Sequence, residues 1–400
     1  MSYLKMINSN PRTMLITIMF FYYASMGILI PYLPLLLSRT VDAKQVGVLI
    51  AIGAFTMMVM QPIWGWLSDK YSIRTVLLIA ISGTITTTIF FPFANGFTVW
   101  VLLLSVYFIF QSPIATLIDT IAVTNFTDTF GRIRLWGSIG FGIAVFLGGI
   151  LLGVPIYMIH FVLLFVTLAF VFYYKSPIKQ KLTSENKIGV GKLFQVFRTG
   201  PIFFVLSLLL FTAISMKGNA TFYSIGLDEL HVYGLLLGSA WLLQVFPEIG
   251  VFLLVDKLAK KITSWTLVII GVSVFAIHFS LLGHFQNIWA WVLLQPLVSI
   301  AFCFWYSGAI RLIKSLVPIQ FQATGQSIFS AVCNGLGGMS GSILSGIIVS
   351  TWNVFIFYQF AGLLCFGTAL LVIILKWFVE KNKTKDVSIP VNNDTLANEK

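Results

Sequence analysis

The stretch Trp241–Val255, WLLQVFPEIGVFLLV, is almost entirely apolar, is long enough for much of a membrane span, and contains one acid, Glu248. An ionised carboxyl group in the middle of a span costs about 2.5–3.5 kcal/mol on insertion scales, so such a group usually faces a bundle interior or a wet cavity. Asp256 follows, and counting back from it at about 1.5 Å per residue places Glu248 about 12 Å inside the membrane. Gln244 shares a helical face with Glu248, and we interpret this face as the lining of a pathway.

The composition extends this interpretation to the whole chain. The 400 residues are 58% hydrophobic and 10% charged, with a mean hydropathy of +0.95, which is outside the range of soluble domains. We therefore predict an all-α, multi-pass membrane protein, most simply of a bacterial cytoplasmic membrane. Cys303, Cys333 and Cys365 all lie in apolar runs and indicate neither disulfides nor a metal site. No catalytic motif is present, so we expect no enzyme and no cofactor.

Apolar runs long enough to cross a bilayer predict about twelve transmembrane helices. They fall near residues 12–37, 44–67, 73–93, 98–122, 133–153, 155–175, 201–226, 234–255, 264–283, 287–310, 323–350 and 354–377. The net charge of +12 comes mainly from Lys and Arg in alternate loops, which indicates topology rather than nucleic-acid binding. This asymmetry predicts that both termini are cytoplasmic.

Polar segments divide the predicted spans into two sets. We assign residues 1–175 to an N-terminal six-helix half, 176–200 to a basic cytoplasmic central loop, 201–380 to a C-terminal six-helix half and 381–400 to a disordered cytoplasmic tail. An internal repeat supports the division. Gln61, Asp69 and Lys70 match Glu248, Asp256 and Lys257 at a constant offset, at the cytoplasmic ends of the second and eighth spans. Such six-helix pseudo-repeats are typical of two-halved transporters.

Two motifs resemble the major facilitator superfamily. The segment 65–74, GWLSDKYSIR, resembles the loop between the second and third spans of that family, with Ser72 and Ile73 as departures. The segment 131–141, GRIRLWGSIGF, resembles the start of the fifth span in the branch that contains the phenylpropionate permease, the lactose permease and the nucleoside–proton symporters. The resemblance implies the major facilitator fold over the whole chain.

The tenth and ninth spans depart from that branch. Lactose permease-like proteins carry His and Glu on the tenth span for proton handling, and the corresponding positions here, near Val298 and Ala301, are apolar. The ninth span has His278 where relatives often have Arg. The family's coupling chemistry therefore does not carry over as a whole.

The resemblance implies that Arg134 binds a hydroxyl or carboxylate of the substrate, for which the planar guanidinium is suited. A topological anchor or a gate ion pair is the alternative. Tyr22, Gln244, Gln295 and Tyr306 would complete an amphipathic pocket for a sugar ring, a nucleobase or a phenyl acid, although ordinary packing also explains the aromatic residues.

Two acids are candidate proton-coupling residues. Burial and a nearby cation act on a carboxyl group in opposite directions, so Glu248 could bind and release a proton as its surroundings change. A static clamp between helices is the alternative. Asp119 lies on a polar stripe of the fourth span and could carry a proton or pair with Arg134.

Four further charged residues are candidates for a functional role. Lys217, in the outer half of the seventh span, could attract an anion, but we favour snorkelling to the headgroups or pairing with Glu248. By the family resemblance, Asp69, Lys70 and Arg74 form a cytoplasmic gate or latch; a plain topogenic loop is the alternative.

We predict a secondary active transporter that works by alternating access, with proton symport (uptake) of a small polar or amphipathic organic solute such as a sugar, a nucleoside or an aromatic acid. Proton-antiport efflux of amphipathic drugs and a non-transporting membrane sensor or scaffold are the alternatives. The expected partners are this solute, the proton and membrane lipid, with no nucleic acid and no metal, and the expected state is a monomer. The sequence identifies neither the solute nor the coupling ion.

Overall fold

The computed structural model describes residues 10–126, 129–152, 154–174, 200–317 and 322–386. In these residues twelve segments are helical, long and apolar enough to cross a membrane, which confirms the predicted number of spans. The first six comprise α2 (Pro11–Leu29), α4 (Ala43–Lys70), α5 (Ile73–Ile89), α6 (Phe97–Gln111) with α7 (Ile114–Asn125), α8 (Phe130–Ile150) and α9 (Ile156–Tyr173). The second six comprise α11 (Gly200–Glu229), α12 (Gly234–Leu258), α13 (Ser264–His284), α14 (Ile288–Leu293) with α15 (Pro296–Leu316), α16 (Gln322–Ser330) with η4 (Ala331–Leu336) and α17 (Gly337–Thr351), and α18 (Val354–Asp386).

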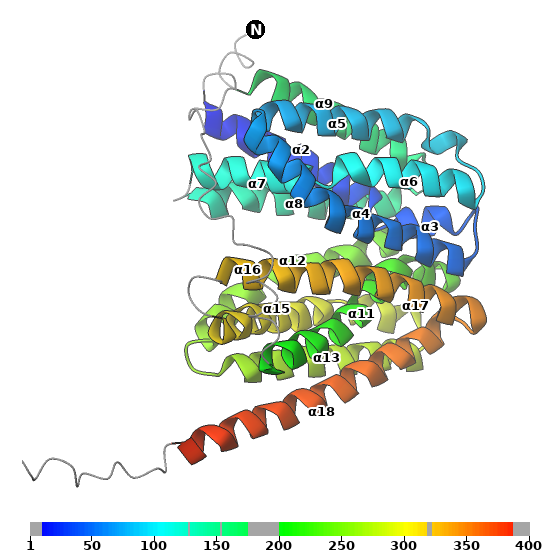
Figure 1. Ribbon diagram of the computed structural model, residues 1–400. Coiled ribbons are helices and arrows are strands. Elements are labelled where there is room, and N and C mark those ends of the chain that lie inside the picture. The colour runs from blue at the N-terminus through cyan, green and yellow to red at the C-terminus, as the bar shows by residue number, and fades with distance from the viewer. Residues whose placement is uncertain (1–9, 127–128, 153, 175–199, 318–321, 387–400) are drawn as a thin grey trace, which may run out of the picture.

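Figure 1 shows α2–α9 stacked on α11–α18, with the helices running roughly parallel across the molecule. The helix α2 begins and α18 finishes at the same end of the bundle, which we call the terminal end; the opposite end is the far end. The predicted linker 176–200 lies outside the described residues apart from Gly200, the first residue of α11.

Prolines interrupt some of the predicted spans. The first predicted span is broken after Leu29, and a short helix, α3 (Leu33–Leu37), follows the turn at Pro31. The fourth span is divided at Pro113 and the tenth at Pro296. Proline has no N–H to donate and its ring clashes with the preceding turn, which explains the breaks. The carbonyl of Pro31 becomes available to another helix as a result.

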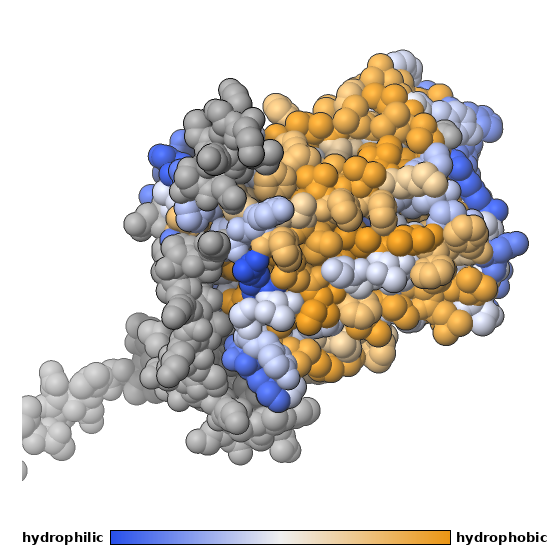
Figure 2. All heavy atoms as spheres, turned by 90° about the horizontal axis from the view of Figure 1, so that it is seen from above, coloured by the Kyte–Doolittle hydropathy of each residue, from blue (hydrophilic) through white to orange (hydrophobic). Residues whose placement is uncertain are grey.

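The surface carries the band expected for a protein in lipid. Figure 2 shows apolar residues across the middle of the bundle and hydrophilic residues at both ends of it. Large side chains such as Leu102, Phe165 and Phe204 are more than half exposed. Water would disfavour this exposure, whereas acyl chains accept it.

The two halves touch most closely at the far end, through the helix pairs α8–α12 and α4–α17. A Cβ atom added at Gly149 would lie 2.2 Å from the backbone nitrogen of Gly238, and one added at Gly47 would lie 2.3 Å from the carbonyl oxygen of Ser342. Glycine therefore allows backbone-to-backbone contact between the halves at both places.

The same helices separate toward the terminal end. On α8, a Cβ atom at Gly142 would lie 3.8 Å from Leu242, its nearest neighbour on α12. Gly131 of α8, Gly250 of α12 and Gly65 of α4 lie nearer the terminal end, and a Cβ atom at any of them would meet nothing within 4 Å. The halves are therefore in backbone contact at the far end and separate toward the terminal end, where α4 packs on α17 and η4 but hardly on α16.

Hydrogen bonds reinforce the far-end contact. The indole N–H of Trp241 donates to Ser224 Oγ at 3.0 Å, and Ser224 Oγ donates to the carbonyl of Pro31 in the first half at 2.7 Å. The ring of Tyr32 lies edge-on to Trp241, with centroids 6.5 Å apart. The proline break in the first span thus supplies an acceptor that joins the two halves.

The last helix differs from expectation at its end. We expected disorder from residue 381, whereas α18 continues to Asp386. The ammonium group of Lys381 lies 4.6 Å from the ring centre of Trp377, one helical turn earlier, and this cation–π contact supports the extra turn.

Replacing Gly238 by Ala should destabilise the protein by about 1–3 kcal/mol, because the new methyl group meets backbone that cannot move aside cheaply. The same change at Gly250 should be neutral or stabilising by up to about 1 kcal/mol, because Ala is the better helix former and has free space there. Thermal unfolding of both purified variants in one detergent measures the difference. Equal effects at the two positions would contradict the splayed arrangement.

Candidate functional site

A cavity of about 650 Å³ lies between the two halves. The first half contributes residues around the α2–α3 turn and from α4 and α6; the second half contributes residues from α11, α16, η4 and α17. This volume is within the range of small-molecule sites. The cavity therefore has the size and the two-sided lining of a solute site between moving halves.

The second half supplies most of the polar groups of the cavity. Lys217 and Thr221 come from α11, and Ser330 and Asn334 from α16 and η4. Asn334 Nδ2 donates to Ser330 Oγ at 3.2 Å, and Thr221 Oγ1 lies 3.0 Å from Ser342 Oγ on α17. The first half adds the amide of Gln61.

The remaining wall is apolar and comes mainly from the first half: Ile30, Leu33, Ile50, Met57, Met58 and Phe108. Methionine and aromatic side chains adapt to the shape of an apolar ligand. The cavity thus has one apolar side and one polar side.

The glycines of η4 and α17 bring these helices against α4. A Cβ atom at Gly335 would lie 2.6 Å from Met58 Sδ, and one at Gly338 would lie 2.8 Å from Ala54 Cβ. In η4 the backbone is a π-helix, a rare form that is frequent at functional sites. The glycine-rich sequence of η4 and α17 thus allows close helix approach and shapes the cavity.

A second polar cluster lies on α2, α7 and α8. Arg134 Nε lies 3.7 Å from Asp119 Oδ1, and the guanidinium carbon lies 4.0 Å from the ring centre of Tyr23. The Tyr23 hydroxyl donates to Asp119 Oδ2 at 3.5 Å. Arg134 and Asp119 are thus brought together, which was one of the two roles left open for Asp119. The sequence analysis missed Tyr23, whose position next to Tyr22 was the available signal.

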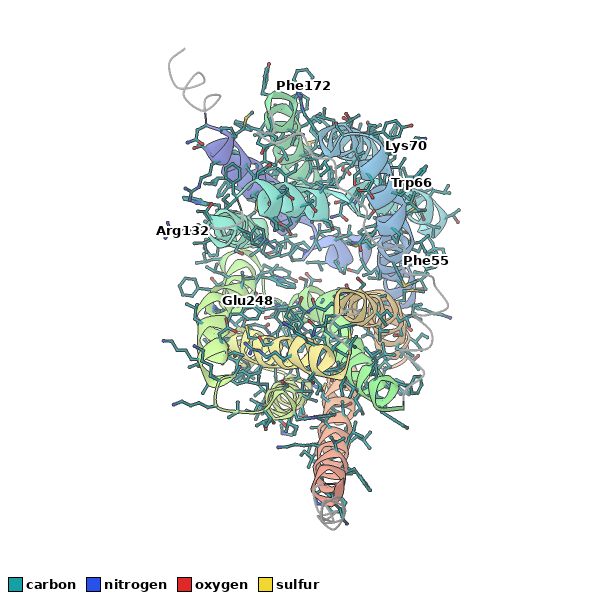
Figure 3. The ribbon with its side chains drawn as sticks, turned by 60° about the vertical axis from the view of Figure 1, so that its left-hand side comes forward. Phe55, Trp66, Lys70, Arg132, Phe172 and Glu248 are labelled. Carbon is teal, nitrogen blue, oxygen red and sulfur yellow. The ribbon has the colours of Figure 1, made fainter. Side chains whose placement is uncertain are left out.

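Glu248 lies across from this cluster. It belongs to α12, which packs on α8, and Figure 3 shows it on the side of the second half that is turned toward the first half. Arg134, on the packed helix α8, belongs to the neighbouring cluster. Within the described residues the Glu248 carboxylate makes no ion pair or hydrogen bond; the thiol of Cys303 contacts only its backbone carbonyl, at 3.7 Å.

The other predicted substrate residues are dispersed. Tyr22 is buried and its hydroxyl accepts a hydrogen bond from Gln111 at 3.3 Å. Ser299 donates to the backbone carbonyl of Gln244. The ring of Tyr306 stacks on Phe302, with centroids 5.3 Å apart.

Gln295 is fully buried, and its amide nitrogen donates to the carbonyl of Trp291 at 3.1 Å. The cavity lining includes none of Arg134, Tyr22, Gln244, Gln295 and Tyr306 among the described residues. Their assignment to substrate binding therefore stays a prediction.

The predicted latch residues lie at the terminal end. Arg74 donates to the carbonyls of Val171, at 3.3 Å, and Phe172 at the end of α9. Lys70 lies over the rings of Trp66, at 5.4 Å, and Tyr71 (Figure 3). In the described chain Asp69 makes no ion pair, whereas its repeat partner Asp256 pairs with Arg311 at 2.9 Å. Arg311 was missed, although it lies in a basic segment.

The structure places Lys217 differently from the interpretation that we favoured. Its position lies twelve residues before the last residue of α11, about 18 Å along the helix, which is too far for its side chain to reach the headgroups. It does not pair with Glu248 either; it lines the cavity.

A bundle of twelve apolar spans, in two halves with a cavity between them, defines a membrane transporter. Residues 12–360 match the MFS_1-like family, and the chain belongs to this family of transporters. The family confirms the resemblance to the major facilitator superfamily.

The chain is also similar in sequence to several curated proteins. The chain is 27% identical to the uncharacterized transporter YwbF of Bacillus subtilis over 91% of this chain and 92% of the relative. It is 23% identical to the maltose permease of Geobacillus stearothermophilus, covering 89% and 92% of the two chains. It is 26% identical to the class H tetracycline resistance protein of Pasteurella multocida, covering 69% and 73%.

Among solved structures, a crystal structure of the nucleoside transporter NupG, carrying a D323A mutation, superposes with a TM-score of 0.82 at 18% identity. The match covers 92% of this chain and 100% of that one. This similarity establishes the fold.

Replacing Asp119 by Asn should lower the free energy of unfolding by about 1–3 kcal/mol, because it leaves the half-buried Arg134 without its counter-ion. The same change at Asp256 should cost less than about 1 kcal/mol, because that carboxylate is 67% exposed. Denaturation of the two purified variants provides the comparison. A larger loss at Asp256 would mean that the Arg134–Asp119 pair is not structurally important.

Proposed function

We propose that the chain is a proton-coupled secondary transporter that takes up a small polar or amphipathic organic solute by alternating access. The observation that carries the proposal is the cavity between halves that touch at the far end and separate at the terminal end. A solute site that is open to one side and closed to the other is what such a mechanism requires.

The proposed direction of opening follows from the charge asymmetry of the loops. Lys70, Arg74 and Lys257 lie at the terminal end, in agreement with a cytoplasmic position for both termini. The described state is then inward-open, and Asp69, Lys70 and Arg74 are proposed to form the gate that closes this end in the opposite state. We propose a monomer, because the solute site needs residues of one chain only.

We assign proton coupling to Glu248 and Asp119. Arg134 contacts Asp119 in its own half, and its helix α8 packs on α12, which carries Glu248 in the other half. When the halves rotate about the far-end contacts, the distances from Arg134 to the two acids change. The acid from which the cation moves away then binds a proton more readily. This exchange would link protonation to the movement of the halves.

Buried polar atoms without partners, on α8 and α12, also support a binding role for Arg134 and Gln244. In the described structure Arg134 Nη1, Gln244 Oε1 and Gln295 Oε1 are buried without a hydrogen-bond partner. Unsatisfied buried groups are rare and are often completed by a ligand or by water. We therefore keep Arg134 and Gln244 as proposed solute-binding residues on the α8–α12 side of the interface, outside the described lining of the cavity. Tyr22, Gln295 and Tyr306 stay proposed substrate residues that lie apart from them.

Efflux is the second candidate function. The tetracycline resistance relative favours it, as does the apolar wall with Met57, Met58 and Phe108, which suits an amphipathic drug. Uptake and efflux differ in the direction in which a proton gradient moves the solute across the membrane.

Replacing Glu248 by Gln should reduce proton-driven accumulation at least about tenfold while sparing solute exchange, because exchange requires no net proton transfer. Proteoliposomes loaded with solute measure exchange, and empty proteoliposomes with an imposed pH gradient measure accumulation. Sugars, nucleosides and aromatic acids form the solute panel.

The matched control is Glu229→Gln, at the far end of α11, which should leave both rates unchanged. Accumulation that persists in Glu248→Gln would refute the coupling role. The absence of gradient-driven movement of every solute in the wild-type protein would instead refute the transport proposal and favour a sensor or scaffold.

A further inference from the structure

The cavity between the halves has a positive charge and no negative one. Among its described lining residues Lys217 is the only charged side chain. The ion pairs found in the described structure, Arg134–Asp119 and Arg311–Asp256, involve neither Lys217 nor another cavity residue. Lys217 therefore lines the cavity, and in the described structure no carboxylate pairs with it.

The backbone holds Lys217 firmly in this position. A Cβ atom on Gly341 of α17 would lie 3.0 Å from Lys217 Cβ, so the glycine lets α11 approach α17 at this level. Thr221, one turn later, donates to the carbonyl of Lys217 at 2.9 Å and also contacts Ser342 of α17. The stem of the lysine is thus fixed between two helices.

Neutral hydrogen-bonding groups share the cavity with Lys217. Gln61 approaches from α4, while Asn334 and Ser330 approach from η4 and α16. A charged group inside a span is costly unless it is paired, and it usually marks a ligand pathway. A bound anion would supply the missing charge, and amide N–H groups would supply its other hydrogen bonds.

The opposite wall excludes a small inorganic ion as the natural occupant. Ile30, Leu33, Met57, Met58 and Phe108 form an apolar surface in a cavity of about 650 Å³, which a simple anion would leave unfilled. A carboxylate attached to an apolar or aromatic body matches both walls.

We propose that Lys217 is the anion-binding residue of the transporter and that the solute is a small organic carboxylate with an apolar body. This inference rests on the proposed transport function, which it narrows to one charge class. An uncharged solute such as a sugar would not require the positive charge of Lys217.

Two probes of matched shape test the proposal: 4-phenylbutyrate and its uncharged counterpart 4-phenylbutanol. Binding to the full-length protein in detergent is measured by calorimetry at pH 7. The wild-type protein should bind the carboxylate at least about tenfold more tightly than the alcohol. Equal affinities, or no binding of the carboxylate, would overturn the proposal. This test needs only the wild-type protein.

The substitution Lys217→Gln should weaken carboxylate binding about tenfold to a hundredfold and leave alcohol binding unchanged, whereas Lys217→Arg should retain most of the preference. The matched control is Lys376→Gln, which removes a lysine of α18 that contacts Thr266 at 3.3 Å outside the cavity. An equal loss in Lys376→Gln, or full carboxylate affinity in Lys217→Gln, would overturn the assignment.

Uptake of the same probes separates this inference from the transport proposal. Accumulation of an uncharged solute, with no preference for the carboxylate, would overturn the anion site and leave transport intact. Binding of 4-phenylbutyrate through Lys217 without any gradient-driven uptake would support the anion site and overturn the transport proposal.

Discussion

The contact between the backbones of Gly149 and Gly238, repeated at Gly47 and Ser342, determines how the two halves can be arranged. Apolar side chains gain little from one another in lipid, so close packing of small residues is the main force that holds helices together there. Both contacts lie at the far end. The halves are consequently joined where their helices touch and free to separate where Gly131 and Gly250 have no neighbour, and the cavity exists because of this difference.

The ionisable groups within the spans lie along the interface between the two halves. Arg134 and Asp119 neutralise each other within the first half, and Glu248 faces them from the second. Lys217 lies in the cavity on the α4–α17 side. Each of these groups avoids lipid by lying where water or a solute can reach it. The interface therefore divides into a mixed-charge region on α8 and α12 and a purely cationic region on α11.

Much of this could be predicted from the sequence, because hydrophobic length and charge asymmetry are local properties. The number of spans and the polar faces that carry Arg134 and Asp119 depend on such signals. The location of Lys217 could not be predicted, because its surroundings depend on Gly341 and Ser342, more than 100 residues away in the chain. The splay of α8 from α12 is likewise a property of packing. Asp119 and Arg134 were recognisable from the sequence, whereas the contact of Tyr23 with each of them depends on the packing of α2 against α8.

The far-end glycine contacts also have a mechanical consequence. From Gly47 to Lys70, α4 extends about 35 Å, so the contact acts as a fulcrum at one end of a long lever. A rotation of about 10° there displaces the other end by about 6 Å, while the touching backbones hardly move. A small rearrangement at a site close to the fulcrum is thereby amplified into a displacement wide enough to admit or exclude an aromatic ring.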